Sequence, residues 1–587
     1  MKKLHKIFGL AVIAVVLAVV FYACDTGNFL DVSPQGSLNS QTLANKTGVE
    51  GNLISAYAML DGWSTSTQGL WGVAASNWIW GDVASDNAYK GSQSGDQPNI
   101  TSIELYHWTT SLTDQYLNDR WRALYEGISR SNATLKLLHS VSGMSQDESD
   151  NVEGQARFLR AHYYFEAWKM WKNIPVFTEK DEGDLKATTS NEGTDPIKQI
   201  EADLNAAIKL LPTTQSEAGR VTQWTAKAYL GRVQAYSGDY SGARTTLKDV
   251  MDNGPYALAD NFRDVFSVAG NNGSETILSY QASVNDGEPN GWNGDYPDRL
   301  EFPHSGSPFG CCGFYQPSQN EVNAFKVDPN NGLPLMVTQP NSWNNDDANF
   351  DSSRTAPVDP RLDWTVGRDG VPFLDWGKHE PGWIRSRSYS GPYSFKKRLY
   401  SKASGAASSV GWSSFQLNSN NLHLYRYADA LLLLAEADVE TGHLDEARQI
   451  VNKIRTRAGQ AAQGPGTGAD NIEVPINDPS ITWANYQVGT YPPGSPYFAD
   501  KASARLAVRA ERRLELAQEG HRLFDLRRYG ATYAEQVLNN FTQVEQNRRP
   551  YYQDASQFDD IDAKYYPIPS QQIDLSHGNL VQNDGFK

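Results

Sequence analysis

The stretch Trp224-Thr-Ala-Lys-Ala-Tyr-Leu-Gly-Arg-Val-Gln-Ala-Tyr236, continued by Ser237-Gly238-Asp239-Tyr240, predicts two helices joined by a glycine turn. Tyr427-Ala-Asp-Ala-Leu-Leu-Leu-Leu-Ala-Glu-Ala437, followed by Thr441-Gly442-His443-Leu444, repeats the pattern. Three positions of the two stretches are in register: Gly238, Tyr240 and Ala243 match Gly442, Leu444 and Ala447. Small alanines stand where two helices must approach closely, as in stacked tetratricopeptide repeats. The sequence therefore predicts a mainly α fold, a tetratricopeptide-like scaffold of helical pairs.

Helical and irregular segments divide the rest of the chain. Apolar residues at helical spacing predict another pair at 121–138 and 152–171, so we expect helical repeats at roughly 40–60, 115–260 and 420–530. Roughly 61–114 and 273–416 are instead rich in Gly, Pro, Asn, Ser and aromatic residues, and they hold or adjoin eleven of the sixteen tryptophans. Loops this long in a compact protein are usually functional or disordered, and the aromatic content argues against disorder.

The N-terminus has the pattern of a secretory signal. Lys2, Lys3 and Lys6 precede the apolar run 8–20, and Ala23-Cys24 follows. The run is shorter than the roughly 20 residues that span a bilayer. A cysteine after a small residue at this point is similar to a bacterial lipobox, so we expect a signal peptide at 1–23, lipidation of Cys24 and a mature body at 24–587 that is anchored to a membrane without spanning it. An ordinary signal peptide with a chance cysteine is the alternative.

Charge and cysteine content argue against two classes of protein, those that bind nucleic acid and those that bind zinc. The net charge of -16 and the lack of a basic block argue against nucleic-acid binding, which needs clustered Lys and Arg. Apart from Cys24, only the neighbours Cys311 and Cys312 remain. Two cysteines and sparse histidine make a zinc site implausible, and we expect no metal and no cofactor.

Several segments resemble one family, the SusD/RagB nutrient-binding lipoproteins of the outer membrane of Bacteroidota. The similar pieces occur in order and span nearly the whole chain: 29–34, 156–161 with 171–175, 426–429 through 452–459, 509–516 with 519–526, and 566–569 with 582–586. The resemblance implies a lipoprotein, facing the cell exterior, that captures an oligosaccharide or polysaccharide and delivers it to a SusC-like TonB-dependent transporter. It implies a binding protein and not an enzyme.

The charged residues of one C-terminal motif have a structural interpretation. Glu511, Arg512, Glu515, Glu519 and Arg522 are three or four residues apart, so they can form salt bridges along a helix. We expect an ionic lattice that holds helices together.

Candidate ligand residues lie in the two irregular regions. Sugars stack their apolar faces on flat side chains, and their hydroxyls need acceptors and donors. The first region offers Asp61, Trp63, Trp80, Asp82, Asp86 and Asn87. The resemblance places Asp86-Asn87 where many family members carry an acidic residue near the ligand. The second region offers Trp383, Arg385 and Tyr389. The alternative is that Trp80 and Trp383 are buried and that the acids cap turns.

Cys311-Cys312 is the sharpest local feature. Adjacent Cα atoms are about 3.8 Å apart across a trans peptide, below the usual disulfide range of about 4.4–6.8 Å, so a bond between them is strained but possible. Export favours the bond. Some carbohydrate-binding relatives use such a pair as an apolar plate against a sugar ring, and the resemblance extends that expectation to this pair. Two free buried thiols are the alternative.

Other functions remain open from the sequence. A glycoside hydrolase needs two carboxylates about 5–10 Å apart, and 68 acidic residues leave room for such a pair. No nucleophile elbow, metal-binding His cluster or phosphate loop is present. A scaffold that binds proteins through its repeats is disfavoured by the tryptophan-rich loops. Fructan, β-glucan, other polysaccharides and a peptide are all compatible as ligands.

Overall fold

A computed structural model describes residues 43–65, 71–109, 111–185, 189–344, 356–460, 462–463, 473–474, 476 and 481–586. The predicted signal peptide and Cys24 lie outside these residues. Across the described ranges, no helix is both long and apolar enough to cross a lipid bilayer. Helices predominate and strands are short, so the prediction of a mainly α fold is confirmed.

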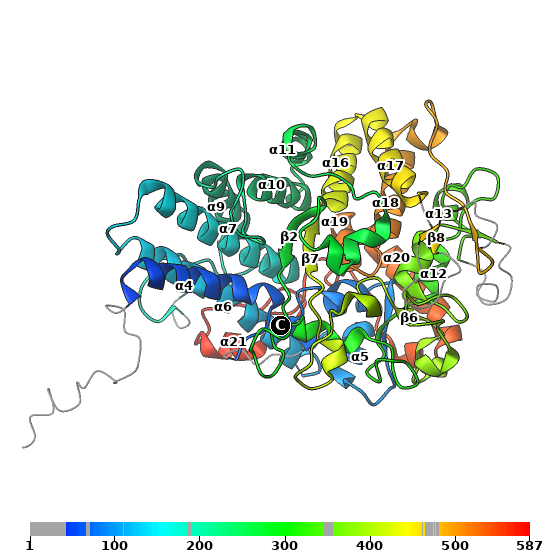
Figure 1. Cartoon of the computed structure of the whole chain (residues 1–587), viewed down its shortest axis with the longest axis horizontal. Helices are drawn as coiled ribbons and strands as arrows, with labels where there is room; N and C mark the ends of the chain where they lie inside the picture. Colours follow the sequence, from blue (N-terminus) through cyan, green and yellow to red (C-terminus); the bar gives the residue numbers. More distant parts are fainter. Residues whose placement is uncertain are drawn as a thin grey trace, which may run out of the picture.

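Most of the long helices form a stack, which occupies the left and upper parts of Figure 1, whereas α20 (Ala531–Arg548) lies at the right. The long helices are α4 (Lys46–Tyr57), α6 (Asp114–Leu138), α7 (Gln146–Trp171), α9 (Pro196–Leu210), α10 (Gln223–Ser237), α11 (Tyr240–Asn253), α16 (Tyr427–Thr441), α17 (Leu444–Ala458), α18 (Lys501–Glu515) and α20. The shorter ones are α5 (Pro98–Glu104), α12 (Gln319–Ala324), α13 (Leu335–Thr338), α14 (Arg361–Thr365), α15 (Arg387–Ser390), α19 (Arg522–Arg528) and α21 (Ser570–Leu575).

The strands pair two by two. Antiparallel pairs are β1 (Ala88–Gly91) with β3 (Phe314–Pro317), β2 (Thr276–Tyr280) with β7 (Leu422–Arg426), β5 (Val366–Gly367) with β6 (Ser394–Phe395), and β8 (Ala462–Gln463) with β9 (Glu473–Val474). The pair β4 (Pro357–Val358) with β10 (Asn485–Tyr486) is parallel. Because β1 and β3 come from different irregular regions, their pairing joins the two regions in space.

Two of the predicted helices end at the predicted glycine turns, whereas α6 and α7 begin at Asp114 and Gln146, earlier than the predicted 121 and 152. Thr222 begins α10 with a capping box, and the chain turns at Gly238 with φ 88°. The same turn ends α16 at Gly442 with φ 89°. A positive φ is accessible to glycine without steric strain, which explains the matching glycines in the two sequences. In the stack, α7 packs on α6 and α9, α10 on α9 and α11, and α16 on α11 and α17.

The ionic lattice exists, but its partners come mostly from other segments. The Glu515 carboxylate on α18 contacts Arg361 and Arg426, each at 2.8 Å, and also Arg457. Arg512 pairs with Asp429 of α16 at 2.6 Å and with Asp525 of α19 at 2.7 Å. Since these pairs join α18 to distant segments, the lattice fixes the irregular regions onto the helical stack.

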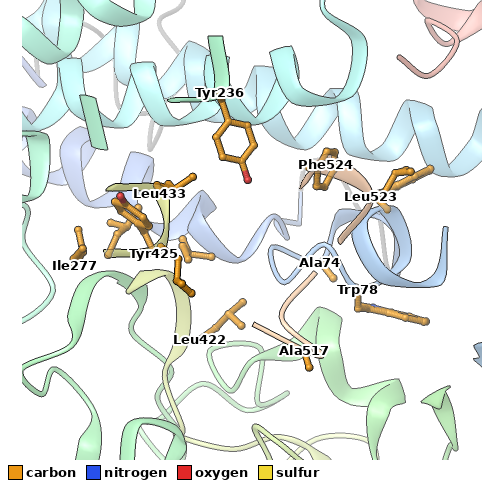
Figure 2. Close-up of a cluster of buried hydrophobic side chains, with 14 of the residues drawn as sticks. Ala74, Trp78, Tyr236, Ile277, Leu422, Tyr425, Leu433, Ala517, Leu523 and Phe524 are labelled. Carbon is orange, nitrogen blue, oxygen red and sulfur yellow. The ribbon is translucent and has the colours of Figure 1, made fainter. Parts of the chain in front are cut away.

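A large hydrophobic core continues from the stack into the irregular regions. Figure 2 shows part of it, where Tyr236 of α10, Leu433 of α16, Tyr425 of β7 and Trp78 gather with Phe524 of α19. Trp78 begins the π-helical segment Trp78–Val83, which is buried throughout. The core therefore uses aromatic residues from the loops as well as from the helices.

A candidate ligand-binding face

Trp63 is positioned by the turn that precedes it. The short helix Ala58–Asp61 ends at Gly62, whose φ is 87°. A Cβ at Gly62 would lie 2.0 Å from the carbonyl oxygen of Val73, so only glycine fits there. The buried Asp61 carboxylate accepts a hydrogen bond of 2.8 Å from the Trp63 backbone N–H. The turn therefore holds Trp63 at the protein surface, where its side chain is half-buried.

Two aromatic side chains from the second irregular region pack against Trp63. The ring centroids of Trp63 and Trp292 are 4.7 Å apart, and those of Trp63 and Tyr296 are 5.1 Å apart. All three rings are half-buried. Glu288 accepts the backbone N–H of Trp292 at 2.6 Å, which fixes the loop that carries it. These contacts bring both irregular regions into one aromatic cluster.

Arg299 extends this cluster to Trp412. Its guanidinium carbon lies 3.9 Å from the Tyr296 ring centroid and 4.5 Å from that of Trp412. Trp412 is 59 % exposed, so its outer face is open to a ligand. An arginine stacked between rings is held in place by cation–π attraction.

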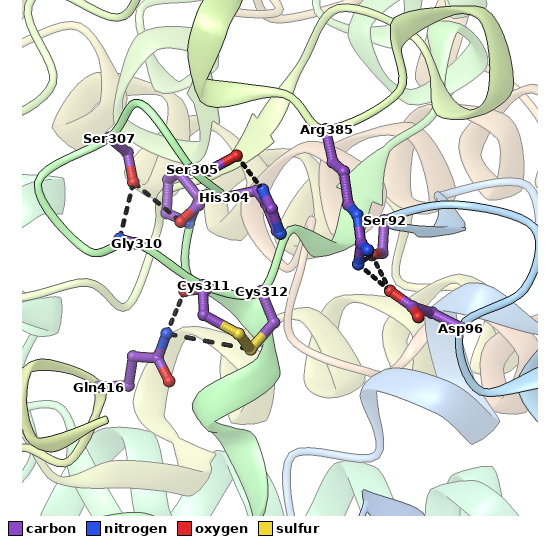
Figure 3. Close-up of a disulfide and its surroundings, with 11 residues drawn as sticks. Ser92, Asp96, His304, Ser305, Ser307, Gly310, Cys311, Cys312, Arg385 and Gln416 are labelled. Atoms are coloured by element: carbon purple, nitrogen blue, oxygen red, sulfur yellow. Dashed lines mark hydrogen bonds and ion pairs between the residues drawn. A yellow bond between two sulfur atoms is a disulfide. The ribbon is translucent and has the colours of Figure 1, made fainter. Parts of the chain in front are cut away.

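The Cys311–Cys312 disulfide is linked to the loop that carries Trp412. The structure contains the bond, and Cys311 is half-buried whereas Cys312 is buried. Gln416 donates a hydrogen bond to the carbonyl oxygen of Cys311 (Figure 3). Gln416 follows Phe415, which is 57 % exposed and belongs to the same short helix, Ser414–Gln416. The disulfide is thereby tied to the loop that carries Trp412.

We name this surface the aromatic face, and its members share exposed or half-buried apolar area: Trp63, Trp292, Tyr296, Trp412, Phe415 and the Cys311–Cys312 disulfide. Polar loop residues adjoin it, with Asn293 donating to Asp286 at 2.9 Å and Ser409 donating its backbone N–H to Asn285 at 2.8 Å. Flat rings beside exposed amides, carboxylates and hydroxyls can stack on the faces of sugar rings and bind their hydroxyl groups.

Trp80 and Asp82 lie inside the protein, unlike the sequence-based expectation of ligand contact. The Trp80 indole N–H donates to the carbonyl oxygen of Gly72 at 2.8 Å, and the ring packs edge-on against Tyr566. Asp82 accepts the backbone N–H groups of Gly520 at 2.9 Å and Arg522 at 3.3 Å. Burial raises the pKa of the Asp82 carboxyl. Both side chains fasten the 78–83 segment to the core, so we leave them out of the candidate site.

Asp86 and Asn87 are also buried and have structural partners. Arg522 binds both Asp86 oxygens, at 2.7 and 3.0 Å, and Arg513 lies 3.1 Å from the same carboxylate. Burial acts to raise the pKa of Asp86, but Arg513 and Arg522 outweigh it and hold the pKa below its usual value. Asn87 accepts a hydrogen bond from Arg513 at 3.2 Å. These residues join the first irregular region to α18 and α19.

The three candidates of the second region are dispersed. Trp383 is buried against Phe373 and His379, with ring centroids 5.3 and 5.2 Å away. Arg385 is exposed and pairs with Asp96, as Figure 3 shows. Tyr389 stacks on Tyr551 with centroids 4.4 Å apart. Of the three, only Arg385 is exposed, and Figure 3 shows it beside His304.

Sequence reasoning selected Trp63 and the two cysteines but missed the other members of the aromatic face. The missed residues are Trp292, Tyr296, Arg299, Trp412 and Phe415. Glycines flank or precede both missed tryptophans, in Gly291-Trp292-Asn293-Gly294 and Gly411-Trp412. The buried Trp80 also has a glycine neighbour, Gly81, so this pattern alone does not identify exposed tryptophans.

Family models match most of the chain. Residues 274–586 match the SusD family, and residues 28–234 match a family described as starch-binding, associating with outer membrane. The first match spans more than half of the chain, so the chain belongs to the SusD family.

Relatives and solved structures agree with this assignment. SusD-like protein P38 of Formosa agariphila is 23% identical over 499 residues, which are 79% of this chain and 84% of that protein. A laminarin-binding SusD-like protein has a TM-score of 0.63 at 22% identity, with 92% of this chain and 99% of that chain covered. Surface glycan-binding protein A of Bacteroides thetaiotaomicron, in complex with laminarihexaose, has a TM-score of 0.58 at 19% identity, with the same coverage. At these identities the structural likeness establishes the fold.

Proposed function

We propose that the protein binds a glycan through the aromatic face and performs no chemistry on it. The observation that carries this proposal is the chain of contacts from Trp63 through Tyr296 and Arg299 to Trp412, whose loop also holds the disulfide through Gln416. A linear oligosaccharide stacks successive ring faces on such a surface. The laminarin-binding and laminarihexaose-bound structures with the same fold support a glycan as the ligand class.

The proposed cellular role is capture at the outer membrane. The family description associates its members with that membrane, and the chain begins with a lipobox-like segment ending at Cys24. We propose that acyl chains on Cys24 anchor the protein, that it faces the cell exterior, and that it delivers the glycan to a SusC-like TonB-dependent transporter. Association with such a transporter is tested by co-purification from membranes of cells that express both proteins.

The glycan site is tested with protein that lacks residues 1–24. A glycan array selects the ligand, and calorimetry then compares Trp412→Ala with the parent. We expect a loss of about 1–3 kcal/mol of binding free energy, because removal of an exposed ring deletes one stacking contact. Trp224→Ala is the matched control, since Trp224 is a half-buried tryptophan on α10, outside the aromatic face.

Two outcomes would contradict the proposal. If Trp412→Ala and Phe415→Ala both bind the selected glycan as the parent does, the aromatic face is not the site. If the purified protein shortens the glycan chain during incubation, the protein is a hydrolase, and two of its carboxylates must then flank the scissile bond.

A further inference from the structure

A second concave site lies between α18 and α20, away from the aromatic face. It is a pocket of about 480 Å³, which is within the usual size range of ligand sites. None of its lining residues belongs to the aromatic face. Three arginines, three aromatic rings and several amides line it. The proposal depends on Arg509, Arg513, Arg522, Trp343, Tyr533 and Asn540.

Positive charge in this pocket exceeds negative charge. Asp86 is the one acidic residue among the described residues that line it. Arg522 uses Nε and Nη2 for Asp86, and Arg513 uses Nε for Asn87 and Nη2 for Asn320 at 2.7 Å. Among the described residues, Nη1 of each arginine makes no hydrogen bond. The Asp86 carboxylate therefore pairs with both Arg513 and Arg522, and each arginine keeps Nη1 as a donor for a ligand.

Arg509 supplies a third guanidinium group that is held in place. It lies 4.1 Å from the ring centroid of Tyr529 and 4.7 Å from that of Tyr533. In the described part of the chain it forms no ion pair, although it is half-buried. Stacking on two rings restricts the side chain without using its N–H donors, so the group is prepared for an anion.

The other lining groups suit a sugar ring. The Trp343 ring is half-buried and lies against Arg513, with the guanidinium carbon 5.5 Å from its centroid. Amide side chains of Asn341, Asn344, Gln536 and Asn540 surround the opening. Amides bind hydroxyl groups as donors and acceptors, and an aromatic ring packs on the apolar face of a pyranose.

We propose that this pocket binds an acidic saccharide, whose carboxylate or sulfate group is held by Arg509, Arg513 and Arg522. A guanidinium fork can bind two oxygens of either group, the planar carboxylate or the tetrahedral sulfate. Hydrogen bonds between oppositely charged groups are stronger than those between neutral groups. Burial and the neighbouring Arg522 lower the pKa of Arg513 to about 10, against the opposing effect of Asp86, so the group stays charged at neutral pH. The protein then has two glycan sites, one for stacked rings and one for a charged unit.

The test is calorimetry on protein lacking residues 1–24, with four probes at low salt. The probes are a uronic-acid trisaccharide, a sulfated trisaccharide, a neutral trisaccharide and inorganic sulfate. We expect one of the two acidic trisaccharides to bind more tightly than the neutral probe and inorganic sulfate, and its identity distinguishes carboxylate from sulfate. Raising the salt concentration should weaken this binding, because the contact is between charges.

Arg509→Gln should weaken binding of the acidic trisaccharide at least 10-fold. Trp343→Ala should also weaken this binding, although it leaves the charge of the pocket unchanged. Arg505→Gln is the matched control: it lies on the same helix, pairs with Glu440 at 2.6 Å and does not line the pocket. Thermal unfolding of each variant checks that it is folded. The proposal is overturned if neither acidic trisaccharide binds, if inorganic sulfate binds equally well, or if Arg505→Gln has the same effect as Arg509→Gln.

Failure of this proposal is distinguishable from failure of the aromatic face. Trp412→Ala should leave binding of the acidic trisaccharide unchanged, and Arg509→Gln should leave binding of the glycan selected on the array unchanged if that glycan is neutral. Each site therefore has a variant that reports on it alone.

Discussion

At the scale of single residues, the Asp61 carboxyl that holds the Trp63 backbone also makes the stability of the protein depend on pH. Burial, followed by the repulsion of Asp298, raises the pKa of Asp61 to about 8, from about 4 in an unfolded chain. The folded protein therefore holds a proton that the unfolded chain releases between these two values. The contribution of this proton to the free energy of unfolding is fully present below about pH 4 and is lost as the pH rises through about 8.

Asp61→Asn should remove this dependence, because the amide resembles the protonated carboxyl and its oxygen still accepts the Trp63 N–H. Relative to the parent, we expect the variant to gain stability as the pH rises from 5 to 9, by an amount on the order of a few kcal/mol. Thermal or denaturant unfolding at pH 5, 7 and 9 measures the difference. A difference that does not change with pH would show that Asp61 is ionised in the folded protein.

Tryptophan illustrates what single residues reveal from sequence alone. Trp80 and Trp412 both lie in regions without regular helices, and both have glycine neighbours. The structure buries Trp80 against Tyr566, which is 486 positions away, and leaves Trp412 exposed. Burial by a partner so distant in sequence leaves no local pattern. The composition of the loops therefore indicated an aromatic site, but only the three-dimensional structure identifies the residues that belong to it.

At the scale of elements, α18 depends on buried charge. Burial alone would raise the pKa of Glu515, but Arg457, Arg426 and Arg361 outweigh it and lower the pKa to about 2. Glu515→Gln would leave these arginines buried with one carboxylate fewer. We expect a loss of about 3–5 kcal/mol in unfolding free energy at pH 7, the range for breaking a buried ion pair.

The pH dependence and a surface pair provide the controls for Glu515. An acid with a lowered pKa stabilises the protein above its unfolded value, near 4, and loses that effect as the pH falls through 2, so the gap between Glu515→Gln and parent should narrow on acidification. Glu217→Gln breaks a surface pair with Arg220, where the glutamate side chain is 66% exposed. It should cost at most about 1 kcal/mol. Equal losses in the two variants would refute a structural role for the lattice.

The glycine turns that end helices were the most predictable local features. The glycine turns after α10 and α16 follow from local sequence, because a positive φ is a property of one residue and its neighbours. The partners of Glu511, Arg512 and Glu515 were less predictable. Their spacing permitted bridges along α18, but the structure pairs them with α16, α17 and residues near α14. Spacing identifies charged residues that share a helix face, and tertiary packing decides their partners.

At the scale of the whole molecule, the two irregular regions form one body with the helical stack. The β1–β3 pair joins residues 88–91 to 314–317, and the buried charges of α18 join the stack to both regions. Ligand residues on loops fixed in this way lose little freedom on binding, so more of the contact energy contributes to affinity. This arrangement explains how long loops can carry a preformed aromatic face.

At the same scale, we expect Cys24 to attach the whole molecule to the membrane. The described chain contains no helix that could span a bilayer, and we expect Lys2, Lys3 and Lys6 with the apolar run 8–20 to direct export. Cys24→Ala should therefore release the protein from the membrane with its melting temperature unchanged, because the helical stack begins at α4, 22 positions later. Membrane fractionation measures the release, in cells that lack the SusC-like partner so that no protein contact retains the variant.

Cys311→Ser with Cys312→Ser is the control for cysteine loss, and it should leave the protein in the membrane fraction. Retention of Cys24→Ala in the outer membrane would refute the lipid anchor.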